Sequence, residues 1–81
     1  MLYFVYMVEC ADGTYYTGTS NDVAKRVDAH NARKGGAKYT RGRLPVRLVY
    51  EETCADKGVA LMREYVIKKM SRARKRALAK T

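Results

Sequence analysis

Two strand-forming runs separated by a tight turn constrain the fold of this chain more than any other feature. Residues 2–9 are apolar and rich in aromatic and β-branched side chains, and residues 14–19 resume that composition after the turn dipeptide Asp12-Gly13. Strands joined by so short a connection pair with each other in an antiparallel hairpin. The chain therefore begins with a β-hairpin, to which the later elements are added.

The length of the turn decides how two tyrosines in the hairpin are oriented. A two-residue loop would place Tyr6 and Tyr16 on opposite faces of the sheet, because shifting the pairing by one residue reverses every side chain. A three-residue loop, residues 11–13, with Gly13 in the left-handed region, places both tyrosines on one face and Gly18 opposite Tyr6. In that register the absent side chain of Gly18 would leave space for a pocket beside the Tyr6 hydroxyl.

Size and composition limit the chain to a single small domain covering residues 1–81. Its 81 residues are near the lower limit for one hydrophobic core, and hydrophobic residues make up 47% of them, enough for a packed core. Two cysteines without metal-ligand spacing argue against both a disulfide scaffold and a zinc site. With no signal peptide and no apolar run long enough to cross a membrane, we expect a cytoplasmic monomer with reduced thiols.

Positive charge is concentrated in the later part of the chain. There are 17 Lys and Arg against 8 Asp and Glu, a formal net charge of +9, and the first of these cations is Lys25. This excess is larger than the net charge of about 2 to 8 that keeps a small domain soluble. A basic field added to a neutral hairpin favours nucleic acid as the partner; a basic partner for an acidic protein is an alternative that no particular motif supports.

After the hairpin, capping residues and apolar spacing predict three helices, one loop and one strand. With the hairpin they give the order ββαβαα, an α+β fold in which helices flank a three-stranded antiparallel sheet. The expected elements are a helix over 23–30 after the capping residues 20–22, a flexible basic loop over 31–44, a strand over 46–53, a helix over 57–70 capped by Asp56, and a helix over 72–80 capped by Ser71.

Two of these elements have patterns that predict which side is buried. In the strand over 46–53, alternation places Val46, Leu48 and Tyr50 on one face. In the helix over 57–70, the expected apolar stripe consists of Val59, Met62, Val66 and Met70, with Ile67 beside it.

Three charged or titratable side chains lie at the borders of helix faces. Arg26 and His30 are four residues apart, next to the buried side of the first helix, although an ion pair of Arg26 with Asp22 and a surface histidine are the ordinary alternatives. Glu64 is the only carboxylate after residue 57 and is expected at the edge of the apolar stripe, facing the sheet. A single carboxylate with open coordination positions suits Mg²⁺, and an exposed ion pair with Lys68 is the alternative.

These residues carry a resemblance to the GIY-YIG nuclease family. Val5-Tyr6-Met7 and Tyr16-Thr17-Gly18 resemble the two signature strands of that family, with both tyrosines and the last glycine kept. The resemblance covers the whole chain, and residues 38–41 (Lys-Tyr-Thr-Arg) and 68–71 are similar to the small stand-alone bacterial members. Many active relatives also carry an asparagine about twelve residues after the metal-binding glutamate, where Arg76 or its neighbours stand here.

The resemblance implies a metal-dependent endonuclease that hydrolyses phosphodiester bonds with one Mg²⁺ or Mn²⁺ ion. It implies that Glu64 holds the metal, that Arg26 clamps the phosphate and that Tyr16 orients water or phosphate. Tyr6 is the expected general base, with a pKa lowered by nearby cations, and His30 is the alternative base. The implied catalytic set is Tyr6, Tyr16, Arg26, His30 and Glu64.

A second set of residues is expected to bind nucleic acid, with DNA favoured over RNA. The expected role is structure-selective cleavage in repair or recombination. Cations and an aromatic ring in a loop suit phosphate contact and stacking, and cations crowd the start of the last helix, where they oppose its dipole. The set is Lys34, Lys38, Tyr39, Arg41, Arg43, Arg72, Arg74, Lys75 and Arg76. A non-catalytic nucleic-acid-binding module is the alternative function, because the family asparagine is missing.

Overall fold

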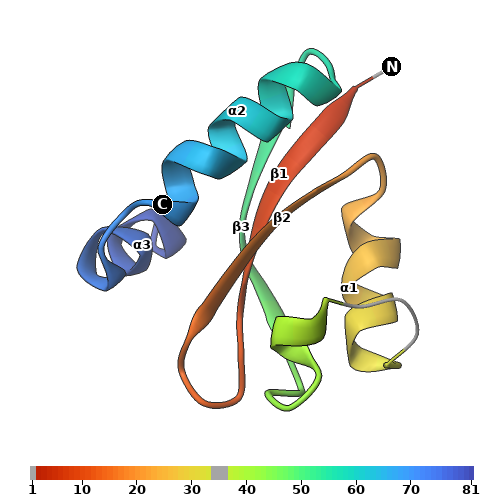
Figure 1. Ribbon diagram of the computed structural model, residues 1–81, viewed down its shortest axis with the longest axis vertical. Helices are drawn as coiled ribbons and strands as arrows, with labels where there is room; N and C mark the ends of the chain where they lie inside the picture. Colours follow the sequence, from red (N-terminus) through yellow and green to blue (C-terminus); the bar gives the residue numbers. More distant parts are fainter. Residues whose placement is uncertain (1, 34–36) are drawn as a thin grey trace.

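The structure, a computed structural model, is a three-stranded antiparallel sheet with helices on both faces (Figure 1). It describes residues 2–33 and 37–81. The strand order is β2-β1-β3, so β1 is the central strand, and the α+β fold with the order ββαβαα is confirmed. The elements are β1 Tyr3–Glu9, β2 Tyr15–Ser20, α1 Val23–Asn31, the 3₁₀ turn η1 Lys38–Thr40, β3 Arg47–Cys54, α2 Lys57–Lys68 and α3 Arg72–Ala79. None of the helices in the described ranges has the length and apolarity needed to cross a membrane.

The hairpin has the three-residue turn, as predicted. Gly13 lies in the left-handed region with φ +84°, and its amide donates to the Cys10 carbonyl at 2.9 Å. The resulting register pairs Tyr6 with Gly18 and Val8 with Tyr16, so both tyrosines share one face. The predicted open space beside Gly18 is wrong: the Tyr6 ring itself occupies it, and a Cβ at Gly18 would lie 2.7 Å from the Tyr6 hydroxyl oxygen.

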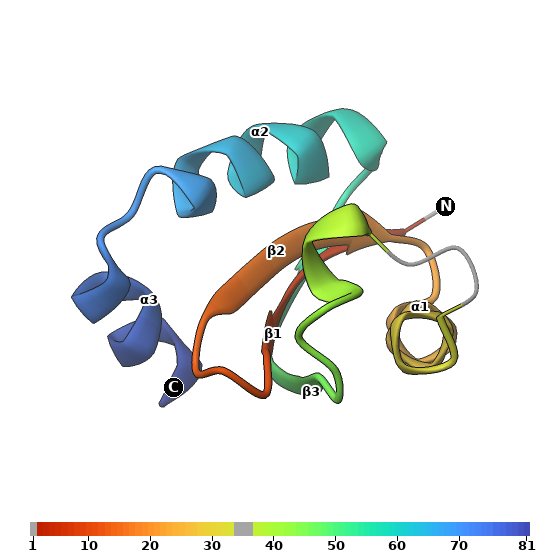
Figure 2. The same cartoon turned by 60° about the horizontal axis from the view of Figure 1, so that its bottom comes forward.

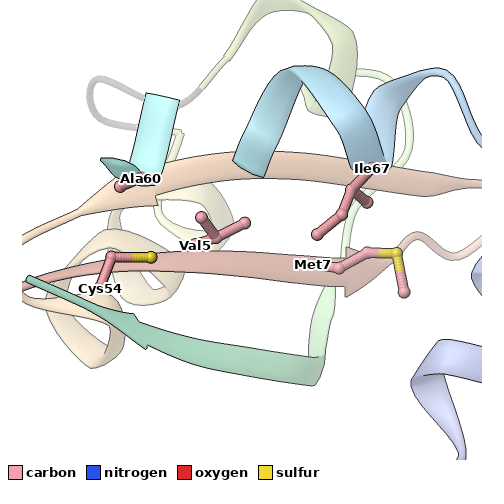
Figure 3. Close-up of a cluster of buried hydrophobic side chains, with 5 residues drawn as sticks. All are labelled: Val5, Met7, Cys54, Ala60 and Ile67. Atoms are coloured by element: carbon pink, nitrogen blue, oxygen red, sulfur yellow. The ribbon is translucent and has the colours of Figure 1, made fainter. Parts of the chain in front are cut away.

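The central strand is buried on both sides. Figure 2 shows α1 and α2 on opposite sides of the sheet. Val5 and Met7 belong to one buried cluster with Ile67 of α2 (Figure 3), whereas Tyr6 and Val8 pack with Val23 of α1 on the other face. Burying an apolar side chain of this size contributes about 1.5 to 3 kcal/mol to folding, so β1 carries much of the core.

The third strand departs from the predicted alternation because it contains a bulge. Met7 pairs with Tyr50 but Val8 pairs with Leu48, which leaves Val49 as an extra residue on β3. Val46 therefore packs on the α1 side of the sheet, whereas Val49 and Tyr50 both pack on the α2 side. The prediction that residues 46, 48 and 50 share one face is wrong.

The buried face of α2 also differs from the prediction. Ala60 and Ile67 are the fully buried residues of this helix, and the small side chain of Ala60 lies against the sheet (Figure 3). Three residues of the predicted stripe are on the outer side, where Met62 is 73% exposed and Val59 and Val66 are about half exposed; the fourth, Met70, follows the helix and packs against the core. The buried face of α2 is therefore rotated about the helix axis relative to the predicted one. Glu64 lies in the middle of this face rather than at its edge, because its helical position is between Ala60 and Ile67.

The helix caps are those that the sequence predicts. Asp22, Asp56 and Ser71 each accept a hydrogen bond from the backbone amide three residues later, at the starts of α1, α2 and α3. The predicted loop over 31–44 contains the turn η1, which the sequence did not indicate, and Thr40 in that turn is buried.

Replacing Gly18 with alanine tests the close approach of the Tyr6 ring. The new Cβ would overlap the ring, so we expect Gly18→Ala to lower the free energy of unfolding by about 1 to 3 kcal/mol, measured by urea denaturation. Gly42→Ala is the matched control, because a Cβ there meets nothing within 4 Å. Its effect should stay within about 1 kcal/mol. Equal effects of the two substitutions would contradict the packing described here.

Candidate active site

The site is built around the hydroxyl of Tyr6 on the central strand. His30, in the last turn of α1, lies over the same face, and its Nε2 atom is 2.9 Å from the Tyr6 hydroxyl oxygen. Tyr16 on β2 completes the group, with its ring edge-on to the imidazole at a centroid distance of 5.4 Å. The hairpin register and the packing of α1 therefore bring three of the predicted residues into one cluster.

Arg26 joins this cluster from the preceding turn of α1. Its guanidinium hydrogen bonds to the Tyr6 hydroxyl, and its charge acts on the imidazole of His30. The carboxylate of Asp22 caps the helix and accepts from the Lys25 amide at 3.1 Å.

Glu64 lies on α2, whose residues contact both β1 and β2. Its charge raises the pKa of Tyr6, and its Oε2 atom lies 3.3 Å from the Lys68 ammonium. Lys68 in turn lies 5.8 Å from the centre of the Tyr16 ring. The Glu64 side chain is 18% exposed, so the predicted ion pair is present but lies at the site rather than on open surface.

Burial sets the protonation of the central pair. Burial, followed by the charge of nearby Tyr16, raises the pKa of Tyr6 to about 12, although hydrogen bonding from Arg26 and its charge act in the opposite direction. The expectation that cations lower the pKa of Tyr6 is therefore wrong, because desolvation outweighs them. Burial, together with the charge of Arg26, lowers the pKa of His30. Near neutral pH the site holds a neutral phenol beside a neutral imidazole.

The donor set at Glu64 fits a hard divalent cation. Within residues 2–33 and 37–81, no three His, Cys, Asp or Glu side chains cluster as a complete metal site. A single carboxylate that is mostly buried suits Mg²⁺ or Mn²⁺, which keep several waters and take further oxygens from a phosphate. The same set does not suit zinc, which takes three or four protein ligands.

A basic groove adjoins the site on the α3 side. A hollow of about 350 Å³ continues into a smaller one of about 180 Å³, and both are lined by Tyr15, Tyr39 and Lys75. The Tyr39 ring stacks on Tyr16, with centroids 6.1 Å apart. The lining contains three cations and no carboxylate. We call this surface the tyrosine groove; it consists of Thr14, Tyr15, Tyr16, Thr17, Tyr39, Lys68, Arg72 and Lys75.

Four members of the tyrosine groove were not predicted from the sequence, namely Thr14, Tyr15, Thr17 and Lys68. Tyr15 and Thr17 alternate with Tyr16 on β2, and their position beside a groove depends on where η1 and α3 pack. The Thr17 hydroxyl is buried and has no hydrogen-bond partner in the part of the chain that the structure describes. Lys68 was considered only as an ion-pair partner. An unpartnered hydroxyl and a lysine beside the Tyr16 ring suit an anionic ligand.

The residues expected to bind nucleic acid are spread over several surfaces. Tyr39, Arg72 and Lys75 line the tyrosine groove. Arg43 is held by Asp12 at 3.0 Å and by the Tyr39 carbonyl at 2.7 Å. The others do not line the groove: Lys38 and Arg41 are exposed, Arg74 and Arg76 each line a separate hollow, and Lys34 lies outside the described residues.

Comparisons with known proteins match nearly the whole chain. A family model described as the GIY-YIG catalytic domain matches residues 2–77. A UPF0213 protein from Desulfotalea psychrophila is 55% identical, over 96% of this chain and 71% of its own length, and one from Halobacterium salinarum is 56% identical, over 95% and 99%. The solution NMR structure of a UPF0213 protein from Bacillus halodurans is 45% identical and has a TM-score of 0.61, covering 99% of this chain and 84% of that one.

The titration of the single histidine tests the electrostatics of the cluster. We expect the imidazole C2 proton of His30, followed by NMR, to titrate below the ordinary pKa of 6.5, because burial and the charge of Arg26 both disfavour the imidazolium. Arg26→Gln should raise the midpoint without restoring 6.5, since burial is the larger cause. Lys25→Gln removes the same charge from an exposed position and should leave the midpoint unchanged. A wild-type midpoint above 6.5 would contradict this description.

Proposed function

We propose, because this chain belongs to the GIY-YIG catalytic domain family, that it is a divalent-metal-dependent endonuclease that hydrolyses phosphodiester bonds in nucleic acid. The observation that carries the proposal is the Tyr6 hydroxyl, 2.9 Å from His30 Nε2 and hydrogen bonded by Arg26. Such a group combines a proton acceptor with a cation for the phosphate. Glu64 stands beside it as the carboxylate that would hold the metal.

Tyr6 and His30 act as a proton relay. Tyr6 does not act as a preformed phenolate that takes the proton of the attacking water by itself. As a water oxygen forms its bond to phosphorus, the water proton passes to the Tyr6 oxygen and the Tyr6 proton passes to His30 Nε2. The bond from phosphorus to the leaving oxygen breaks, and that oxygen takes a proton from solvent. His30 then returns its extra proton to solvent. The pKa of about 12 at Tyr6 is compatible with this sequence, because the phenolate is never formed in advance.

Charge on the scissile phosphate is balanced by groups at the edge of β2. Arg26 donates to a phosphate oxygen in the planar geometry that a guanidinium offers. Mg²⁺ or Mn²⁺ held by Glu64 would supply Lewis-acid stabilisation of the phosphate and of the leaving oxygen. Lys68, 3.3 Å from Glu64, adds a second protein cation on the same side.

The tyrosine groove supports nucleic acid as the substrate. Lys68, Arg72 and Lys75 can contact successive phosphates, and the Tyr39 ring can stack on a base. Because so little surface lies outside the site, we propose recognition of the shape of the substrate rather than of its sequence, with DNA ahead of RNA and with repair or recombination intermediates as the substrate class.

A second function, binding without turnover, has one observation in its favour. Arg76, twelve residues after Glu64, is where many active relatives have an asparagine. It lines a hollow with Glu9 and Arg47 and does not line the tyrosine groove. The two functions make different predictions for substitutions that remove chemistry but keep charge.

Substitutions at Tyr6 and Glu64 distinguish an enzyme from a binding module. Tyr6→Phe removes one hydroxyl and no charge, so cleavage of a panel of branched and linear DNA with Mg²⁺ or Mn²⁺ should fall by about 10² to 10⁴ while binding stays within about twofold. Glu64→Gln should abolish metal-dependent cleavage without weakening metal-free binding. Asp28→Asn, an exposed carboxylate of α1, is the matched control and should cleave like the wild type. The proposal fails if the wild type cleaves no DNA or RNA substrate, or cleaves only substrates that Glu64→Gln cleaves as well. The protein would then be a nucleic-acid-binding module rather than an enzyme.

Two neighbouring cations of α3 test the path of the nucleic acid. Lys75 lines the tyrosine groove, whereas Arg74 lines a separate hollow with Met70 and Leu78. Lys75→Ala should weaken DNA binding and reduce the slope of log affinity against log salt by about 1, since one phosphate contact is lost. Arg74→Ala removes the same charge and should change the slope much less. Equal changes would place the path outside the groove.

A further inference from the structure

Thr40 extends the buried pair of Tyr6 and His30 by one more hydrogen bond. It is the last residue of η1, and only 1% of its surface is exposed. Its hydroxyl oxygen lies 2.9 Å from His30 Nδ1 and 2.9 Å from the Ala37 carbonyl oxygen. The chain of contacts therefore runs from Tyr6 through both ring nitrogens of His30 to the backbone of the turn.

The number of available protons fixes the direction of these bonds. A carbonyl oxygen only accepts, so the single hydroxyl proton of Thr40 points to Ala37. The Thr40 oxygen must then accept from His30, which requires a proton on Nδ1. A neutral imidazole carries one such proton, so Nε2 is left with a lone pair directed at the Tyr6 hydroxyl.

The opposite tautomer has weaker support in the geometry. The Ala37 amide also points to His30 Nδ1, but at 3.4 Å, which is longer than either contact of the Thr40 hydroxyl. With the proton on Nε2, Tyr6 would lose its acceptor, and its oxygen would have to accept from both His30 and Arg26. The first arrangement gives each of the three side chains a partner of the right kind.

We propose that Thr40 is a positioning residue that holds His30 as the Nδ1-protonated tautomer, so that Nε2 is the acceptor of the Tyr6 proton. The catalytic role of Thr40 rests on the function proposed above, whereas the tautomer of His30 does not depend on that function. When Nε2 takes the proton, the Nδ1 proton stays bonded to Thr40, and the turn stabilises the imidazolium that forms. Tyr39, the preceding residue, lines the tyrosine groove, so one short turn both contacts the nucleic acid and orients the proton acceptor.

Nitrogen NMR of the full chain measures the tautomer without metal or nucleic acid. Because His30 is the only histidine, its two ¹⁵N shifts report the tautomer directly at a pH above its titration. We expect a protonated Nδ1 and a bare Nε2 in the wild type and in Thr40→Ser, and a shift toward protonated Nε2 in Thr40→Val, which has the same shape but no hydroxyl. Thr53→Val, on the exposed part of β3, is the control and should leave the tautomer unchanged.

Either of two results would overturn the proposal: a wild type with its proton on Nε2, or a folded Thr40→Val with an unchanged tautomer. If Thr40→Val does not fold, the wild type and Thr40→Ser still decide, since both must hold the Nδ1 proton.

Cleavage gives a second and separable measurement. Thr40→Val should lower kcat by about 10- to 100-fold, the range for residues that orient a functional histidine, with KM nearly unchanged and with recovery in Thr40→Ser. A loss confined to KM would instead mean that Thr40 acts on binding and would overturn the positioning role. If the wild type cleaves no substrate, the proposed function fails while the tautomer assignment is still judged by NMR.

Discussion

The register of the hairpin is the constraint on which the functional contacts depend. Gly13, with φ +84°, makes the turn three residues long, and this sets Tyr6 opposite Gly18. Any side chain at Gly18 would overlap the Tyr6 ring, which lies against the glycine backbone. A slip of one residue between β1 and β2 would place Tyr6 and Tyr16 on opposite faces of the sheet, since side chains alternate along a strand. This one turn thus decides that the two tyrosines share a face.

Local desolvation, and not the charge of the whole protein, controls the proton chemistry of the site. A net charge of +9 would by itself favour a phenolate at Tyr6, yet burial raises its pKa to about 12. Most of the cations are exposed, where water and salt screen them, whereas Tyr6 is 1% exposed. The nearby Arg26 offsets part of the burial effect but does not reverse it. Tyr6 is therefore suited to share a proton with His30 rather than to hold a negative charge.

The sequence predicts the elements well because their signals are local, and it fails where packing chooses between alternatives. The caps at Asp22, Asp56 and Ser71 and the glycine turn act within a few residues, so they could be recognised directly. The second long helix has apolar residues on more than one face, and hydropathy favours Val59, Met62 and Val66. The sheet selects the other face because Ala60 allows a closer approach. Thr40 and the tyrosine groove have no local signal, since their positions depend on η1, β2 and α3 packing together.

The open edge of β2 explains how so small a domain can join groups from both faces of its sheet. Tyr6, His30 and Arg26 lie on the α1 side of the sheet, whereas Glu64 is on α2, where it pairs with Lys68 beside the Tyr16 ring of β2. An exposed edge is ordinarily a liability, because its free amides and carbonyls invite another strand. Here Tyr16 and Lys68 lie beside that edge, and the tyrosine groove adjoins it. A fourth strand paired to β2 would cover that edge, so three strands with β1 at the centre keep the core covered and leave the groove beside β2 open.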